Sequence, residues 1–388
     1  MSVAFKGFTG LAFYDIWRAF NGFTLLTPFE GKSVRLVDMK GRETHHWETE
    51  FAPATYGELL PNGNLLYAGK AEDGHLKDIE GAGGVLMELD WDGNVIWEYR
   101  DSYLHDGFCR MKNGNTLVIK WVEVPREIAA RVKGREPSTE RNGVMWGDVI
   151  QEITPDGRMV WEWIAHEHLD PEKDLTCPLC PRITYAHANC CEELPNGNIL
   201  VSFMKNNTIS VIEKETGKII FSWGQDELAH QHSVSILDNG NLLVFDNGYH
   251  PKGFAMGESR VLEVNPSTTE MVWTYTGPKG VPQFFYSSIV SSCQRLPNGN
   301  TLICEGTSGR LFEVTAEHEL VWEYVLPQES SSNDANHGMI YGAYRYGLDY
   351  SGLKRPVPLP EERQPQPGAP SGDEEAGAVQ SRLELLGY

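Results

Sequence analysis

The chain has 388 residues, of which 40% are hydrophobic and 22% charged, so it can bury a sizeable core. Its formal net charge of −21 would repel a phosphate backbone or an anionic membrane surface, so we expect neither nucleic acid nor membrane as a partner. No apolar run reaches transmembrane length, and the N-terminal residues lack the basic region of a secretory signal. We therefore expect a cytoplasmic protein whose seven cysteines are reduced.

In chain order, the N-terminal part predicts three strands: GFTLLTP (22–28), VRLVDMKGR (34–42) and HHWETE (45–50). Five copies of a longer unit follow. Each copy has an Asn-Gly-Asn turn, an apolar strand, a strand ending in a polar turn, and a closing strand that contains tryptophan, such as VIWEYR. Asn-Gly favours a type I′ hairpin turn, and strands at a period of roughly 50 residues are typical of a β-propeller. The turns occupy residues 62–64, 113–115, 196–198, 239–241 and 298–300.

The first three strands lack the inner strand that begins every other copy. The segment NHGMIYGAYRYG (336–347) supplies one strand near the other end of the chain. If this strand completes the first blade, the ring closes and exposed sheet edges disappear. We therefore predict an all-β fold over residues 1–354: a six-bladed β-propeller with four-stranded blades, its first blade closed by the C-terminal strand.

The last part of the chain, residues 355–388, differs in composition. It is rich in proline, glycine and acidic residues, which is typical of a disordered or surface-draped tail. The final segment DEEAGAVQSRLELLGY could form a short helix with one apolar face. That face would dock on the propeller or on a second subunit, so a homo-oligomer formed through the tail is one expectation.

Histidine recurs at the start of the strand that precedes the Asn-Gly turn. In a propeller this strand lines the central channel, so equivalent positions from different blades converge at one end of it. Imidazole can act as a nucleophile, a general base or a metal ligand near neutral pH. We predict a site at the propeller axis with His105, His187 and His232 as catalytic residues. Other candidates at or near the same positions are His230, His337, Asp106 and Asn189.

Several of these phrases resemble the bacterial arylsulfotransferase family. They are YAHANCCEELPNGNILVSF, HQHSVSILDNGNLLVFDNG, FFYSSIVSSCQRLPNGNTLICEG and, near the start, GLAFYDIWRAFNGFTLLTP. The resemblance covers about residues 8 to 350 and implies a six-bladed propeller. It also implies transfer of a sulfuryl group between phenols through a histidine at the channel mouth, without a nucleotide sulfate donor or a metal.

The resemblance also implies roles for individual residues. The family's H-x-N motif matches His187 and Asn189, and its Q-H motif before an FDNG strand matches His232. An arginine that follows this strand is matched to Arg260, although His250 and Lys252 lie nearer to the expected place. The predicted substrate-binding residues are Asn189, Arg260, His337, Tyr286 and Asp106.

The residues by themselves leave other chemistries open. Histidines with Asp106 nearby would also suit a transition-metal ion at the axis, bound by His105, His187, His232 and His337, for hydrolase, lyase or oxygenase chemistry. A non-catalytic propeller that binds a peptide or a subunit is a third hypothesis. Aromatic residues before the sixth inner strand, including Tyr286, would either stack on an aromatic substrate or pack between blades.

Two insertions interrupt the repeat. Residues 123–136 predict a short helix, with proline near its first turn and glycine near its end. Residues 166–187 contain the C-x-x-C motif formed by Cys177 and Cys180. Together with Cys190 or Cys191, this pair could bind structural zinc; it could also be a redox pair or part of an inert loop.

Overall fold

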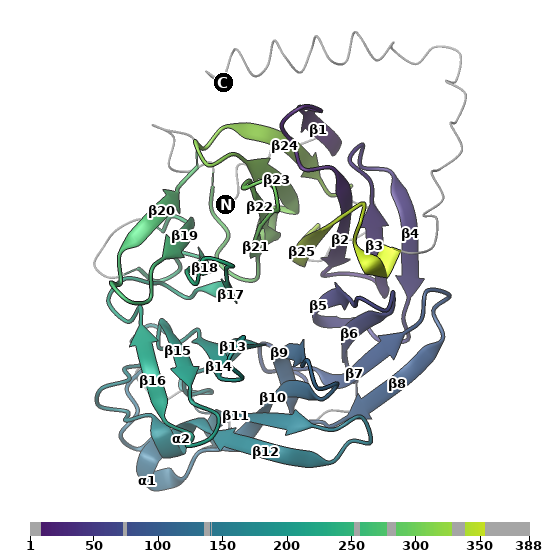
Figure 1. Ribbon diagram of the computed structural model, residues 1–388. Coiled ribbons are helices and arrows are strands. Elements are labelled where there is room, and N and C mark those ends of the chain that lie inside the picture. Colours follow the sequence, from purple (N-terminus) through teal and green to yellow (C-terminus); the bar gives the residue numbers. More distant parts are fainter. Residues whose placement is uncertain are drawn as a thin grey trace.

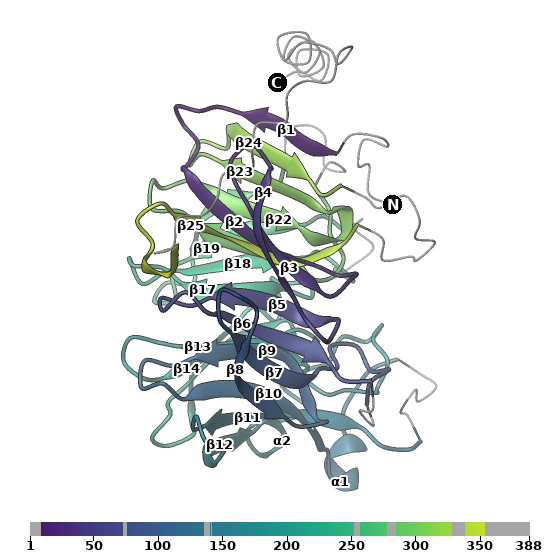
Figure 2. The ribbon, with the colours of Figure 1, turned by 90° about the vertical axis from the view of Figure 1, so that its right-hand side faces the viewer.

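The computed structural model describes residues 9–72, 76–135, 140, 142–251, 257–277, 285–327 and 338–353. These residues form six antiparallel sheets arranged as blades around a common axis, which Figure 1 shows from one end and Figure 2 from the side. The predicted six-bladed propeller is therefore confirmed. The tail 355–388, with its expected helix and dimer contact, lies outside the described residues.

The first three blades follow the order of the chain, except that the innermost strand of blade 1 comes from the C-terminal part. In each blade the first-named strand is the innermost. Blade 1 contains β25 (Ile340–Gly347), β2 (Gly22–Pro28), β3 (Ser33–Val37) and β4 (Glu43–Glu48). Blade 2 contains β5 (Pro53–Leu59), β6 (Leu65–Lys70), β7 (Gly84–Leu89) and β8 (Val95–Arg100). Blade 3 contains β9 (Leu104–Arg110), β10 (Thr116–Glu123), β11 (Trp146–Ile153) and β12 (Met159–Ile164).

The other three blades repeat this arrangement, and the last has one extra strand. Blade 4 contains β13 (Ala188–Glu193), β14 (Ile199–Phe203), β15 (Thr208–Ile212) and β16 (Ile219–Trp223). Blade 5 contains β17 (His232–Ile236), β18 (Leu242–Asp246), β19 (Arg260–Val264) and β20 (Met271–Tyr275). Blade 6 contains β21 (Ser292–Arg295), β22 (Thr301–Glu305), β23 (Arg310–Val314), β24 (Leu320–Val325) and the added strand β1 (Gly10–Tyr14).

Strands from the two end regions of the chain complete blades 1 and 6. Strand β25 pairs with β2 in antiparallel register from Gly22↔Gly347 to Pro28↔Ile340, as the missing inner strand predicted. Strand β1, which the sequence did not predict, pairs with the outer strand β24 of blade 6. Figure 1 shows β1 beside β24 and β25 beside β2. The C-terminal strand thus fills the inner position of blade 1, and the N-terminal strand covers the outer edge of blade 6.

The Asn-Gly turns differ from the predicted type I′ geometry. In the first of them, the N–H of Gly63 donates to Leu60 O and the N–H of Leu60 donates to Asn64 O, both at 2.8 Å. Gly63 has a φ of 88°, whereas Asn62 is not among the residues with positive φ. This is a type I turn followed by a glycine bulge, which Pro61 favours because its ring fixes φ near −65° at the second turn position.

A repeated hydrogen bond joins neighbouring blades. The indole Nε1–H of Trp47 on β4 donates to Asp90 O in the next blade at 2.9 Å, and Trp97 on β8 donates to Pro155 O at 2.7 Å. Trp322 on β24 makes the same bond to Met39 O at 2.9 Å and so links blade 6 to blade 1. Each such bond contributes about 1 kcal/mol to stability.

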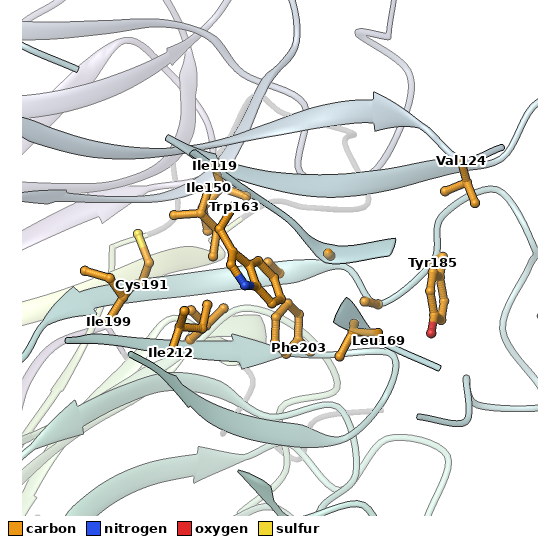
Figure 3. Close-up of a cluster of buried hydrophobic side chains, with 14 of the residues drawn as sticks. Ile119, Val124, Ile150, Trp163, Leu169, Tyr185, Cys191, Ile199, Phe203 and Ile212 are labelled. Carbon is orange, nitrogen blue, oxygen red and sulfur yellow. The ribbon is translucent and has the colours of Figure 1, made fainter. Parts of the chain in front are cut away.

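The hydrophobic core lies between the blades. Figure 3 shows the cluster between blades 3 and 4, where Ile119, Ile150, Trp163, Ile199 and Phe203 pack at 0–2% exposure. These strands read as almost continuous apolar runs because both of their faces are covered by a neighbouring blade.

The helices are short and lie in the insertions. Helix α1 (Arg126–Ala129) begins after Pro125, so the predicted helix is present but spans only one turn. Helix α2 (Ala165–His168) follows β12 and was not predicted. No helix in the described part of the chain is both long and apolar enough to cross a membrane.

Candidate functional site at the channel axis

A cavity of about 1060 Å³ occupies the propeller axis and is lined by the inner strands. The inner strands run in the same direction, so their first residues meet at one end of this cavity. The wall at that end contains Thr55, Asp106, Asn189, His232, Ser233, Ser291 and Tyr341. We call this end the histidine end.

β-Bulges place side chains at the histidine end. In blades 4 and 5 the pairing of the inner strand shifts between Ala188 and Cys190 and between His232 and Val234. The extra residues, Asn189 and Ser233, are left out of the ladder and line the cavity. A bulge of this kind re-aims a side chain, which an alternating strand pattern does not predict. Blade 3 has a larger irregularity, in which three residues between Leu104 and Phe108 face one residue of β10, and Asp106 in this stretch lies on the cavity wall.

His105 and His187 converge on Asp106. His105 Nδ1 lies 3.0 Å from Asp106 Oδ2, and His187 Nε2 lies 3.2 Å from the same oxygen. The two imidazole side chains are 0% and 2% exposed, whereas the Asp106 side chain is 17% exposed. The structure therefore places Asp106 at the cavity surface, with both histidines behind it.

The charges of this cluster are set by its contacts. Burial disfavours the charged form of His105, but Asp106 and the fully buried Asp148, 3.3 Å from His105 Nε2, raise its pKa. Burial would raise the pKa of Asp106, but its hydrogen bonds with His105 and His187 hold that pKa well below its usual range. Asp106 is therefore an anion at neutral pH, compensated by the imidazole donors behind it.

Behind His187 lies a second polar layer. His187 Nδ1 is 3.1 Å from Thr184 Oγ1, and the ammonium of Lys205 donates to the same hydroxyl oxygen at 2.5 Å. Lys205 is 5% exposed, and burial lowers its pKa. The hydroxyl proton of Thr184 is thus available to His187 Nδ1, which leaves His187 Nε2–H to donate to Asp106.

His232 faces the cavity itself. Its Nδ1 lies 2.8 Å from Asn247 Oδ1 and 3.2 Å from the carbonyl oxygen of His230, both of which are acceptors. Nδ1 must therefore carry the proton, so Nε2 keeps a free lone pair. Burial lowers the pKa of His232, which keeps the imidazole neutral at neutral pH. Among the three predicted catalytic histidines, this is the one on the cavity wall.

The other predicted site residues lie in different surroundings. Asn189 is on the cavity wall, and its Nδ2 donates to Gln231 O at 2.9 Å. Arg260 lies on the third strand of blade 5, away from the cavity lining, where it forms an ion pair with Asp246 at 2.5 Å. Tyr286 is also outside the cavity lining, and its ring lies against Gly257. His337 lies outside the described residues.

Aromatic residues do line the channel, but they come from other strands. Tyr344 and Tyr346 alternate along β25, and Tyr341 joins them because a register shift leaves it out of the ladder with β2. Tyr56 and Phe108 stack on each other with ring centroids 4.9 Å apart. The sequence analysis assigned a stacking role only to aromatic residues before β21, so it gave none to these. For Tyr344 and Tyr346, their alternation along a strand already identified as an inner strand was the available signal.

The C-x-x-C motif has partners that the sequence analysis did not assign to it. Cys177 and Cys180 lie beside His230 and His250, and the ligand atoms of all four are within 4.8 Å of one another. The expected partners lie elsewhere: Cys191 packs in the core shown in Figure 3, and the thiol of Cys190 donates to Val234 O at 3.3 Å. Neither Cys190 nor Cys191 therefore belongs to the ligand cluster around the motif.

Fold and site together define a β-propeller with a cluster of histidines and a carboxylate at one end of its channel. The family model described as arylsulfotransferase (ASST) matches residues 58–326, and the chain belongs to this family. Membership supports a sulfotransferase-like enzyme. No curated protein matches the sequence significantly.

Solved structures share the fold at low identity. A protein of unknown function from Bacteroides caccae is 15% identical, has a TM-score of 0.54, and the match covers 83% of this chain and 98% of that one. A catalytically inactive virginiamycin B lyase from Staphylococcus aureus, solved with quinupristin, is 12% identical with a TM-score of 0.43, over 81% of this chain and 87% of that one. At such identities the similarity concerns the fold alone.

Proposed function

We propose that this protein transfers sulfuryl groups from aryl sulfates to phenols at the histidine end of the channel, with His232 as the nucleophile. The observation that carries the proposal is the position of His232: it lines the cavity, its Nδ1 is held by Asn247, and its Nε2 lone pair is free. Membership of the arylsulfotransferase family supplies the reaction class.

The chemistry has two displacement steps. In the first, His232 Nε2 attacks the sulfur of the aryl sulfate, an N–S bond forms, and the S–O bond breaks as the phenolate leaves. In the second, the oxygen of an acceptor phenol attacks the sulfur, the S–N bond breaks, and its electron pair returns to Nε2. The proton lost by the acceptor passes through channel water to the departed phenolate, so charge and protons balance.

The neighbouring groups support this role. His105 and His187 both contact Asp106 Oδ2, which disperses part of the negative charge that would otherwise repel a sulfate ester. The tyrosines on β25, together with Tyr56, offer rings on which an aryl group could stack. An aromatic small molecule therefore remains the substrate class that we propose.

We further propose that the axis histidines act without a metal. His105 has carboxylate oxygens within 3.3 Å of both of its ring nitrogens. His187 is held between Asp106 and Thr184. Each nitrogen of these two rings therefore lies within 3.3 Å of a carboxylate or hydroxyl oxygen of the protein.

The seven free cysteines support the proposal that the protein is cytoplasmic.

The experiment measures 4-nitrophenol release from 4-nitrophenyl sulfate, with and without an acceptor phenol. We expect acceptor-dependent release, and we expect His232→Ala to lower it by about 10²–10⁴-fold. His46→Ala is the control, because His46 is exposed on β4 with a side chain 49% accessible. Full activity of the His232→Ala protein would refute the assignment of the nucleophile. Absence of acceptor-dependent release in the unaltered protein would refute the proposed reaction.

A further inference from the structure

Four metal-ligating side chains meet at a site away from the channel. Cys177 and Cys180 come from the insertion before β13, His230 precedes β17, and His250 follows β18. None of them belongs to the cavity lining at the axis. Cys177, Cys180 and His230 are 6%, 4% and 2% exposed, and His250 is partly exposed. Within the described residues, this is the one group of three or more such side chains close enough to share an ion.

The spacing of the ligand atoms fits a tetrahedral ion. With Zn–S bonds of about 2.3 Å and Zn–N bonds of about 2.0–2.1 Å, tetrahedral angles place sulfur and nitrogen about 3.6 Å apart. Cys177 Sγ lies 3.6 Å from His250 Nδ1, and Cys180 Sγ lies 3.7 Å from the same nitrogen. Cys180 Sγ is 3.0 Å from His230 Nε2, so a small outward movement of one side chain would complete the tetrahedron.

The backbone holds both halves of the site in place. The N–H of Cys177 donates a hydrogen bond to Lys205 O at 2.8 Å, and the N–H of Cys180 donates one to Cys177 O at 3.1 Å. The N–H of His230 donates to Asn207 Oδ1 at 2.8 Å. His230 and His250 both have positive φ, 61° and 55°. Non-glycine residues adopt this conformation at a cost, and such strain gathers at functional sites.

The chemistry of the four ligands also favours an ion. Two buried thiols and two imidazoles make only weak hydrogen bonds with one another, so without an ion their polar atoms gain little from burial. Two thiolates would balance the charge of a divalent cation. Soft sulfur with imidazole in a tetrahedral set selects zinc among the common divalent ions.

We propose that Cys177, Cys180, His230 and His250 bind one zinc ion in a closed, structural site. The ion would join the insertion 166–187 to the two segments that flank the inner hairpin of blade 5. Four protein ligands leave no open position for a substrate. The same insertion carries Thr184, which contacts His187, so the ion would fix the wall behind the histidine end.

The decisive measurement is the metal content of the purified full-length chain, expressed with zinc in the medium. We expect about one zinc per chain, lost in Cys177→Ser and in His250→Ala. The histidine variant is included because His250 is partly exposed and its replacement disturbs the core least. Cys190→Ser is the matched control, since this cysteine neighbours the site in sequence but points to Val234 O. It should retain the zinc.

A second measurement does not depend on the variants. Co²⁺ added to metal-free protein should give the visible absorption of a tetrahedral ion and a thiolate-to-cobalt charge-transfer band. Zn²⁺ should displace both signals and raise the melting temperature. The proposal is overturned if the unaltered protein contains no zinc and Co²⁺ produces no thiolate band. A Cys177–Cys180 disulfide, recovered after alkylation without reduction, or zinc retained in both ligand variants would overturn it equally.

Discussion

At the residue scale, two structural features recur around the ring, one at each end of the inner strands. Bulges at the start of the inner strands bring Asn189 and Ser233 to the cavity wall. Glutamates on the third strands hold the turns at the opposite end of the inner strands: Glu88 accepts from Asn62 and Asn64 at 3.1 and 2.7 Å. The sequence showed the asparagines but not their glutamate partner, because the two are separated by a whole strand.

Half-buried carboxyls in the channel make the stability depend on pH. Burial raises the pKa of Glu58 to about 7, although Arg110 opposes the shift, and burial raises the pKa of Glu192 to about 7. Both residues line the cavity. A carboxyl whose pKa is raised in the folded state contributes stability that is fully present below its unfolded pKa. This contribution is lost as pH rises through about 7.

We therefore expect the melting temperature to fall between pH 5 and pH 8.5, and Glu58→Gln to flatten that fall. The amide cannot ionise, so the largest gain of the variant should be at the alkaline end. Thermal melts followed by circular dichroism at several pH values measure this. Glu48→Gln is the control, because the Glu48 side chain is 74% exposed. Parallel pH curves for Glu58→Gln and the unaltered protein would contradict the prediction.

At the element scale, the closure of the ring depends on a buried ion pair as well as on strand pairing. Arg345 on β25 pairs with Glu313 on β23, and both side chains are 0% exposed. Arg345 Nε also donates to Thr24 Oγ1 on β2 at 3.0 Å, and the guanidinium lies 4.2 Å from the centre of the Trp322 ring. Glu313 in turn accepts from the N–H of Phe20 at 2.8 Å. Blades 1 and 6 thus meet around one charge pair.

Arg345→Met is expected to lower the free energy of unfolding by about 3–5 kcal/mol, because it leaves the carboxylate of Glu313 buried without its partner. Urea denaturation measures the change. Arg100→Met removes a comparable ion pair on the outer strand β8, where the arginine side chain is 55% exposed. That change should cost less than about 1 kcal/mol. Similar losses for the two variants would show that the closure does not depend on the buried pair.

At the scale of the whole molecule, the two ends of the chain have unequal roles. Strand β25 completes blade 1, and the residues just after it contact blade 2: Tyr350 Oη donates to Leu59 O at 2.7 Å, and Ser351 Oγ donates to Pro61 O at 2.9 Å. The tail that follows has the composition of a segment without a core of its own.

We expect a chain that lacks residues 356–388 to fold with an unchanged melting temperature. A chain that lacks residues 336–388 should not yield soluble protein, because blade 1 would lose its inner strand and Glu313 would lose Arg345. Soluble yield and thermal melts of the two truncated chains test this. A stable product from the longer deletion would show that the ring does not need β25.

The sequence by itself determined the number of blades, the inner position of each first strand and the closure by residues near 340. These follow from local signals, namely Asn-Gly turns and strand periodicity, repeated often enough to fix a ring. It also placed His105, His187 and His232 at one end of the axis. Strand β1 could not be predicted from the sequence, because a single added strand has no repeat and is defined only by the sheet edge that it covers.

Tertiary structure alone decided which of those histidines faces the channel and what each contacts. The bulges that aim Asp106 and Asn189 depend on the register between strands, and Asp148, Thr184 and Lys205 reach the site from segments with no shared motif. The partners of Cys177 and Cys180 were undecidable for the same reason. His230 and His250 lie fifty or more residues further on, and only the packing of blades 4 and 5 brings them to the thiols.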